Sequence, residues 1–178
     1  MQNGIKNTAV FDLDGTLAII EKRRLKAEAA LPPGVALKKA SHKDKDKYWA
    51  ELLSPDNIPL DEPNEPVVRA LKMHWDLGDT VFIFSGRSDR LKEETVSWLE
   101  EHDIPYSKLV MRDSGHNHYL DDVTLKKSWL GEHEYNGELR KAHVDKEKIL
   151  VVYDDRNVVV KMWREQGVPC FQVAEGNF

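Results

Sequence analysis

Residues 7–17 read NTAVFDLDGTL, a short apolar run that ends in two carboxylates. Thr8–Phe11 is an apolar, strand-like run, and two carboxylates two residues apart follow it before a glycine. Because side chains alternate between the faces of a strand, Asp12 and Asp14 would point the same way if the strand continued. Two like charges that close repel each other unless a cation or a shared proton compensates. The alternative is a solvated turn, since Asp-Gly is a common turn dipeptide.

Outside this stretch, short apolar runs alternate with segments of helical periodicity. Further strands are predicted at residues 80–84, 108–111, 148–153 and 170–173, and helices at residues 21–30, 41–53, 64–77, 90–102, 122–130 and 158–166. Strands that alternate with helices predict a parallel sheet with right-handed crossovers and helices on both faces. The expected fold class is therefore α/β, with a three-layer Rossmann-like parallel sheet.

The length and the prolines indicate how the chain is divided. A chain of 178 residues suits one compact domain, so residues 1–178 are expected to form a single domain. Residues 20–63 contain two predicted helices and end in a loop with Pro55, Pro59 and Pro63. This segment lies between the first strand and the next helix–strand unit, and we expect it to be a small helical cap insertion over the mouth of the first strand.

The composition restricts the class of protein. The net charge is −5 and the isoelectric point is near 5.8, whereas a protein that wraps duplex nucleic acid is usually basic. Any contact with nucleic acid therefore has to be local. The single cysteine, Cys170, excludes an internal disulfide, fits a reducing cytoplasm, and is expected to be buried in the last strand. No signal peptide and no apolar run of the ~20 residues that span a membrane is found, so a soluble cytoplasmic protein is expected.

Polar side chains follow three of the predicted strands, at the point where each strand ends: Asp12 and Asp14, Ser85 and Arg87, and Asp154 and Asp155. The ligand site of such a sheet lies beyond the carboxyl ends of its strands, so these side chains should meet at one edge. Four carboxylates at one edge need a cation, and oxygen ligands without a His or Cys cluster favour Mg²⁺. The alternative for the pair Asp154 and Asp155 is the N-cap of the helix that follows.

The segments DLDGT, FSGR and YDD, with a lysine before the last of them, resemble the four motifs of the haloacid dehalogenase superfamily of phosphotransferases. The chain is more closely similar to the 3′-phosphatase domain of T-even bacteriophage polynucleotide kinase-phosphatase, through FDLDGTLA, SGR, DDV and the stretch DDRNVVVKMWREQGVPCFQVAEGNF. This resemblance covers nearly the whole chain except roughly residues 20–63. It implies a Mg²⁺-dependent phosphatase that acts on nucleic-acid 3′ ends or 3′-nucleotides. Because no GxxxxGK[ST] motif occurs, the kinase half is not expected, and the chain is expected to be a stand-alone phosphatase.

The resemblance assigns the chemistry to the aspartates. It implies that Asp12 is the nucleophile, which attacks phosphorus in line and forms an aspartyl phosphate. Asp14 would be the general acid that protonates the leaving oxygen, and then the base that activates water. Mg²⁺ would be held by the Asp12 carboxylate, the Asp14 backbone carbonyl and Asp155, with Asp154 as a direct or indirect partner.

Other side chains would bind the substrate. Ser85 is expected to donate a hydrogen bond to a phosphate oxygen, and Arg87 is expected to hold a phosphate oxygen with its guanidinium. Arg23 falls at the position of an active-site arginine of the phage enzyme, although with Arg24 it could instead belong to a solvated helix face. Thr16 is expected among the substrate-binding residues.

The phosphate-binding lysine has two candidates. Asp122 and Lys126 are four residues apart, so on a helix they share a face and can pair, which would orient the lysine. The spacing of the phage enzyme, counted from Asp121, does not reach a lysine. Either the register shifts by one, to Asp122 as a substrate-binding residue and Lys126, or Lys127 serves, and Lys126 is preferred. Arg112 is expected either to contact substrate or to form a surface ion pair.

The insertion brings basic and aromatic residues together: Lys38, Lys39, His42, Lys43, Lys45, Lys47, Tyr48 and Trp49. Proteins that bind single-stranded ends combine such residues, which contact phosphates and stack on bases. The alternative is a solvated lysine face, interrupted by Asp44 and Asp46, with Trp49 packing the insertion onto the core.

Three functions remain open from the sequence. The first is a Mg²⁺-dependent phosphatase for 3′-phosphates of nucleic-acid ends or 3′-nucleotides. The second is a phosphatase for small phosphate monoesters or nucleotides, with the insertion as a lid. The third is a catalytically silent module that binds phosphorylated ligands or a protein partner, which the full set of acidic and basic site residues disfavours.

Overall fold

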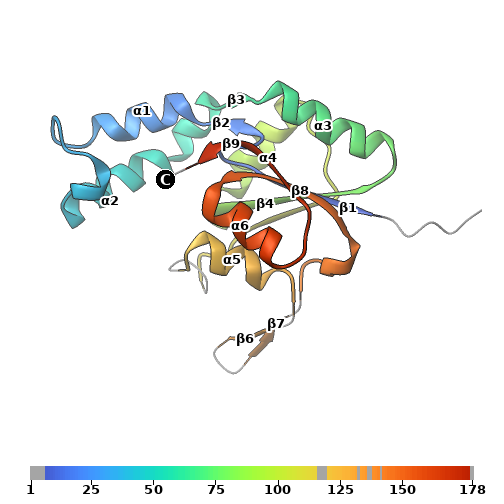
Figure 1. Cartoon of the computed structure of the whole chain (residues 1–178). Helices are drawn as coiled ribbons and strands as arrows, with labels where there is room; N and C mark the ends of the chain where they lie inside the picture. Colours follow the sequence, from blue (N-terminus) through green and yellow to red (C-terminus); the bar gives the residue numbers. More distant parts are fainter. Residues whose placement is uncertain (1–6, 116–119, 132, 136–137, 141, 177–178) are drawn as a thin grey trace, which may run out of the picture.

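The computed structural model describes residues 7–115, 120–131, 133–135, 138–140 and 142–176. Its centre is a five-stranded sheet in the order β5-β4-β1-β8-β9, in which every neighbouring pair is parallel (Figure 1). The strands are β1 (Thr8–Asp12), β4 (Thr80–Ser88), β5 (Lys108–Arg112), β8 (Ile149–Arg156) and β9 (Cys170–Gly176). The strand that carries the DLDGT motif is therefore the middle one, with β4 and β8 on either side.

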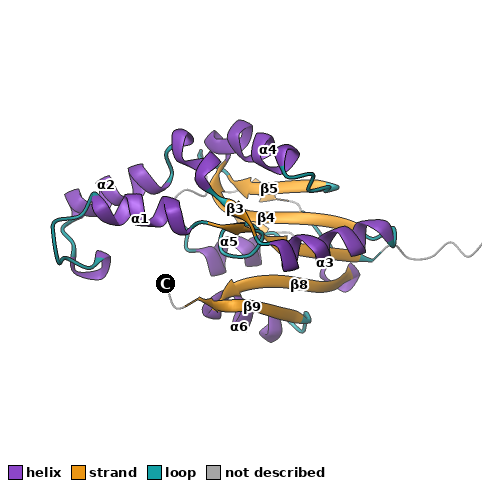
Figure 2. Cartoon of the chain, turned by 90° about the horizontal axis from the view of Figure 1, so that it is seen from above, coloured by secondary structure: helices purple, strands orange, loops and turns teal. Residues whose placement is uncertain are grey.

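Helices cover both faces of the sheet, as Figure 2 shows from above. They are α3 (Glu65–Asp76) and α4 (Lys92–Glu101) on one face, and α5 (Asp122–Ser128) and α6 (Asn157–Glu165) on the other. The alternation along β1 divides the core: Phe11 packs with the residues of α3 and α4, whereas Val10 packs with those of α5 and α6. The expected α/β fold with a three-layer, Rossmann-like parallel sheet is confirmed.

Residues 20–63 form a separate helical layer beside the sheet. They contain α1 (Glu21–Ala29), a 3₁₀ turn η1 (Leu37–Lys39), α2 (His42–Leu52) and a second 3₁₀ turn η2 (Pro55–Leu60). A two-stranded ribbon of β2 (Ala18–Ile19) and β3 (Glu62–Pro63) brings the two ends of this segment together, and η2 packs against α4. Helices α1 and α2 lie side by side and extend away from the sheet (Figure 1).

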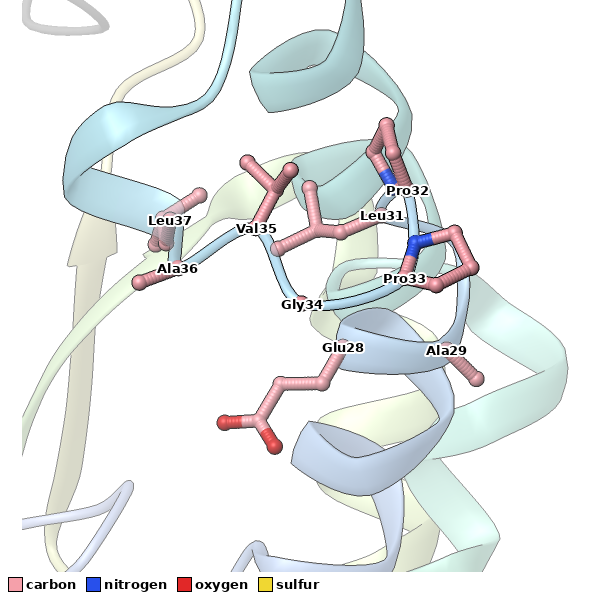
Figure 3. Close-up of a pocket in the computed structure, with 9 residues that line it drawn as sticks. All are labelled: Glu28, Ala29, Leu31, Pro32, Pro33, Gly34, Val35, Ala36 and Leu37. Carbon is pink, nitrogen blue, oxygen red and sulfur yellow. The ribbon is translucent and has the colours of Figure 1, made fainter.

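The helical layer has its own small core, in which Tyr48 and Leu52 of α2 pack against Ala27 of α1. Trp49, which one alternative expects to pack the insertion onto the core, has an exposed fraction of 49%, and it is Ile58 of η2 that packs into the core beside the sheet. Figure 3 shows a pocket between the end of α1 and the loop that follows it. Most of its lining residues have apolar side chains, and its one carboxylate, Glu28, pairs with Arg24. This pocket contains none of the predicted site residues.

Some elements differ from the sequence predictions. The short antiparallel pair β6 (His133–Tyr135) and β7 (Glu138–Arg140) was not predicted, because three-residue strands leave little periodicity to detect. The turns η3 (Asp89–Leu91) and η4 (Lys146–Lys148) complete the elements. Cys170 is buried at the start of β9. Among the described residues, no helix is both long and apolar enough to cross a membrane.

Candidate active site

Three aspartates meet at the carboxyl edge of the sheet. Asp12 ends β1, and Asp154 and Asp155 lie near the end of the neighbouring strand β8. One carboxylate oxygen of each lies within 4.8 Å of the corresponding oxygens of the other two, and all three residues are buried. Three buried carboxylates at this separation repel one another unless a cation lies between them. The oxygen ligands fit a hard divalent cation such as Mg²⁺.

Lys126 of α5 completes this group, which we call the aspartate–lysine cluster. Its side chain is buried, and its ammonium donates to Asp12 Oδ1 at 2.5 Å and to Asp154 Oδ2 at 2.8 Å. Lys127, the other candidate, is exposed. The structure thus brings Lys126 to the aspartates.

The predicted contact between Asp122 and Lys126 is wrong. Asp122 instead accepts from Arg112 and Arg156. An ammonium is attracted more strongly to buried carboxylates than to a part-exposed one, because water screens the latter. The helix spacing permits contact between Asp122 and Lys126. The ammonium instead contacts Asp12 and Asp154, which the ends of β1 and β8 place beside it.

Burial and charge set the protonation of the aspartate–lysine cluster. Burial raises the pKa of Asp12 well above its usual range, and Lys126 opposes this only in part. Burial and the neighbouring charge of Asp154 raise the pKa of Asp155 to about 6. Burial alone would lower the pKa of Lys126, but Asp12 and Asp154 outweigh it and raise the pKa. The ammonium therefore stays charged, but its single positive charge does not balance the three carboxylates.

Gly15 explains why the motif needs a glycine after its second aspartate. Its φ is +87°, in the left-handed region, and a Cβ at this position would overlap the carboxylate of Asp155. The Thr16 hydroxyl donates to Asp155 Oδ1 at 3.4 Å. The turn therefore positions Asp155 against the backbone that follows β1. Thr16 is buried, so its direct contact with substrate stays a prediction.

Asp14 belongs to a different group, although it is only two residues from Asp12. Its Oδ1 accepts from Arg23 Nη2 at 2.8 Å and from Arg87 Nε at 2.9 Å. Burial alone would raise the pKa of Asp14, but Arg87 and Arg23 outweigh it and lower the pKa. The two aspartates of the DLDGT motif thus have opposite electrostatic surroundings.

Asp61 joins both arginines and was missed in the sequence. Its carboxylate accepts from Arg23 Nε at 2.9 Å and from Arg87 Nη2 at 2.6 Å. Arg23 Nη1 also donates to the Leu52 carbonyl, so α1, α2 and the end of η2 are joined at this point. The group of Asp14, Arg23, Asp61 and Arg87 is called the arginine–aspartate cluster below. A single aspartate in a proline-rich loop has no motif spacing that would reveal it.

The arginine–aspartate cluster is closed to solvent at its guanidiniums. The side chains of Arg23 and Arg87 are 0% exposed, so Arg23 does not lie on a solvated helix face as Arg24 does. Both guanidiniums already face carboxylates, and this geometry favours their holding Asp14 in position. Their direct contact with a phosphate stays a prediction.

The remaining predicted residues lie at the same edge. Ser85 is buried, and its hydroxyl accepts from the Arg87 backbone N–H at 3.2 Å. Arg112 forms an ion pair with Asp122, one of its two predicted alternatives. The helix that follows β8 has no side-chain N-cap, so Asp154 and Asp155 do not serve as caps.

Comparisons with known proteins show the family to which this chain belongs. The sequence model of the polynucleotide kinase PNKP phosphatase domain matches residues 51–178. The chain is 31% identical, over 116 residues, to a protein of Autographa californica nuclear polyhedrosis virus that carries the name of a bifunctional polynucleotide kinase/RNA ligase. That match covers 64% of this chain and 15% of the viral protein.

Solved structures share the fold. A chain in the structure of the Pnkp1/Rnl/Hen1 complex superposes with a TM-score of 0.64 and 30% identity, over 97% of this chain and 48% of that one. A haloacid dehalogenase-like hydrolase of Streptococcus pneumoniae superposes with a TM-score of 0.65 and 14% identity, over 94% of this chain and 84% of that one, which shows the fold alone. The chain spans less than half of the length of the first two relatives. It nevertheless belongs, by the match over residues 51–178, to the family of the polynucleotide kinase PNKP phosphatase domain, with a haloacid dehalogenase-type fold.

Proposed function

We propose that this chain is a Mg²⁺-dependent phosphatase that removes the 3′-phosphate from nucleic-acid ends or 3′-nucleotides through an aspartyl phosphate on Asp12. The observation that carries the proposal is the aspartate–lysine cluster. A buried carboxylate at a strand end contacts an ammonium and lies beside two further carboxylates that fit a divalent cation. This arrangement supplies positive charge where a phosphate would bind next to a nucleophile.

In the first step, a carboxylate oxygen of Asp12 attacks phosphorus, and the bond from phosphorus to the 3′ oxygen breaks. Asp14 gives its proton to that leaving oxygen. In the second step, Asp14 takes a proton from water, which attacks the aspartyl phosphate and releases inorganic phosphate. Lys126 and Ser85 contact the phosphoryl oxygens in this scheme. Asp12, Asp155, Asp154 and the Asp14 backbone carbonyl would hold Mg²⁺, which supplies charge neutralisation between nucleophile and phosphate.

The lowered pKa of Asp14 conflicts with its role as the general acid in this scheme. Arg23 and Arg87 favour the ionised carboxylate, but a general acid must carry a proton. We therefore propose that the bound phosphate draws the guanidinium of Arg87 away from Asp14. This move would raise the pKa of Asp14 and give Arg87 the predicted contact with a phosphate oxygen.

The substrate class and the role of the insertion rest on the family and on position. The polynucleotide kinase phosphatase family, the similarity to the viral polynucleotide kinase/RNA ligase and the similarity to a chain of the Pnkp1/Rnl/Hen1 RNA repair complex support a nucleic-acid end as substrate. Residues 20–63 join the site through Arg23 and Asp61, which supports their role as a small cap beside Asp14. In this proposal, residues 1–178 act as one phosphatase domain.

The test compares phosphate release from a 3′-phosphorylated oligonucleotide, its 5′-phosphorylated twin, a sugar phosphate and an aryl phosphate, each with Mg²⁺ and with EDTA. We expect Mg²⁺-dependent release that favours the 3′-phosphorylated oligonucleotide and is lost in Asp12→Asn. Lys126→Met should also lose this release, and Lys127→Met is its matched control, because Lys127 is exposed. Equal or better turnover of the sugar phosphate would show a phosphatase of small monoesters. If none of the substrates is turned over with any divalent metal, the chain is a catalytically silent binding module.

A further inference from the structure

The two carboxylate oxygens of Asp14 have different surroundings. Oδ1 accepts from Nη2 of Arg23 and from Nε and Nη2 of Arg87, whereas Oδ2 accepts from no described residue. Of the described residues, Glu94 alone has a buried side-chain atom without a hydrogen-bond partner, so Oδ2 of Asp14 is not buried. The Asp14 side chain is 27% exposed, in agreement with this. Oδ2 is therefore the oxygen that is open to a substrate.

Asp61 holds Arg23 with both of its carboxylate oxygens. Arg23 Nε donates to Asp61 Oδ1 at 2.9 Å, and Arg23 Nη2 donates to Asp61 Oδ2 at 3.0 Å. The third nitrogen, Nη1, donates to the Leu52 carbonyl at 2.9 Å. A two-point contact of this kind fixes the plane and the direction of a guanidinium as well as its distance. Asp61 thus sets the position of Arg23 Nη2, which contacts Asp14 Oδ1.

Arg87 is held less firmly than Arg23. Only its Nη2 contacts Asp61, at 2.6 Å, and its Nη1 donates to Thr95 Oγ1 at 3.3 Å, which is longer than most such hydrogen bonds. In the proposed function, Arg87 moves from Asp14 to the bound phosphate. Arg23 would then be the remaining contact of Asp14 Oδ1, and Asp61 the group that keeps Arg23 in place.

Asp61 is itself fixed to the core of the protein. Trp98 of α4 is buried, and its Nε1 donates to the Asp61 backbone carbonyl at 3.0 Å. The Asp61 backbone N–H donates to the Ile58 carbonyl at 3.1 Å, and η2, which contains Ile58, packs against α4. The side chain of Asp61 is 0% exposed, so water does not compete for its oxygens. Asp61 is therefore a rigid link between the insertion and the core.

We propose, resting on the phosphatase function above, that Asp61 is a positioning residue for the general acid. Asp61 fixes Arg23, Arg23 occupies Oδ1 of Asp14, and Oδ2 is left to face the leaving oxygen of the substrate. In the first step, the O–H bond on Oδ2 breaks, the 3′ oxygen takes the proton, and Asp14 is left as a carboxylate. This transfer needs Oδ2 within hydrogen-bond reach of that oxygen, and a misplacement of about 1 Å can cost about 10²-fold in rate.

The first test compares Asp61→Asn with the parent on two substrates that differ in their need for a proton. The alkoxide that leaves a nucleoside 3′-phosphate has to be protonated, whereas the leaving group of nitrophenyl phosphate departs without a proton. The measured quantity is the single-turnover rate of alcohol release with Mg²⁺, which does not include hydrolysis of the aspartyl phosphate. We expect Asp61→Asn to slow release from the nucleoside 3′-phosphate by about tenfold or more relative to release from nitrophenyl phosphate.

A purely structural role of Asp61 gives a different result. Equal slowing of both substrates would mean that Asp61 only supports the fold, and it would overturn the proposal, as would unchanged rates for both. Glu62→Gln is the matched control at the adjacent residue, and it should leave both rates unchanged because its pair with Lys22 is more than half exposed.

The second test is a double-mutant cycle of Asp61 and Asp14, measured on the nucleoside 3′-phosphate. Asp14→Asn removes the acid, so the addition of Asp61→Asn should cause no further selective loss on this substrate. A further loss as large as that in the parent background would mean that Asp61 acts independently of Asp14, and would overturn the proposal.

Trp98→Phe replaces Asp61→Asn in the first test if the latter variant does not fold. It removes the donor to the Asp61 carbonyl and keeps an aromatic ring in the core, so we expect the same selective loss at a few-fold. An unchanged ratio of the two rates in this variant would then overturn the proposal. Absence of alcohol release from either substrate by the parent would instead contradict the proposed function itself.

Discussion

The aspartate–lysine cluster and the arginine–aspartate cluster take one aspartate each from the same DLDGT motif and give them opposite properties. Asp12 ends β1 among carboxylates, and burial raises its pKa. Asp14 lies past the strand end between two guanidiniums, which lower its pKa. Identical side chains two residues apart thus differ because of what the neighbouring elements bring to them. One cluster has an excess of negative charge that a cation can balance, and the other is already balanced.

The largest expected effect is a difference between Asp12 and Asp14 in the formation of the aspartyl phosphate. Asp12→Asn should abolish both phosphate release and labelling of the protein from a phosphorylated substrate, a loss of about 10³-fold or more, because the nucleophile is gone. Asp14→Asn should still accept phosphate from an aryl phosphate, whose leaving group needs little protonation, and should then accumulate the aspartyl phosphate. Acid-stable labelling and rapid-quench kinetics check this pair. Equal phosphorylation of both variants would contradict the assigned roles.

The next effect concerns stability and Asp61. Asp61→Asn leaves two buried guanidiniums facing one carboxylate, so we expect the free energy of unfolding to fall by about 3–5 kcal/mol. Glu62→Gln is the matched control at the adjacent residue, since its pair with Lys22 is more than half exposed and should contribute about 0–1 kcal/mol. Urea unfolding of both variants measures the difference. Similar losses in the two would show that the arginine–aspartate cluster does not hold the fold.

A smaller effect depends on pH and on metal. Because the pKa of Asp155 is raised to about 6 in the folded state, the folded chain binds more protons than the unfolded chain between about pH 4 and 6. The metal-free protein should therefore lose about 1–3 kcal/mol as pH rises through this range, and Asp12 acts in the same direction. Mg²⁺ should restore that loss at pH 7.5 and have little effect at pH 5.

Asp155→Asn tests the origin of that pH dependence. The variant should be more stable than the metal-free parent at pH 7.5 and should no longer respond to Mg²⁺, because the charge that destabilises the fold is the charge that binds the ion. Thermal unfolding with Mg²⁺ and with EDTA at the two pH values measures both effects. A variant that keeps the full Mg²⁺ response would exclude Asp155 as a ligand.

The fold and the aspartate–lysine cluster could largely be predicted from the sequence, whereas the arginine–aspartate cluster could not. Strand ends are visible as apolar runs that stop at a carboxylate, and parallel strands bring such ends together. Asp61 has no such marker, because it reaches Arg23 and Arg87 through a loop whose path depends on how the insertion packs. The partner of Asp122 was missed for the same reason: helix spacing defines neighbours along the chain, but not competing charges from other elements.

The smallest expected effect concerns contact between the insertion and the polynucleotide. The arginine–aspartate cluster joins this insertion to the site. Lys43 and Lys47 are exposed on α2, about 8–14 Å along the helix from Leu52, whose carbonyl contacts Arg23. The double variant Lys43→Ala/Lys47→Ala should raise KM for a long 3′-phosphorylated oligonucleotide by a few-fold and make it less salt-dependent, with kcat/KM for a dinucleotide kept. Lys161→Ala, on α6, is the control. An unchanged KM would mean that these lysines form a solvated face.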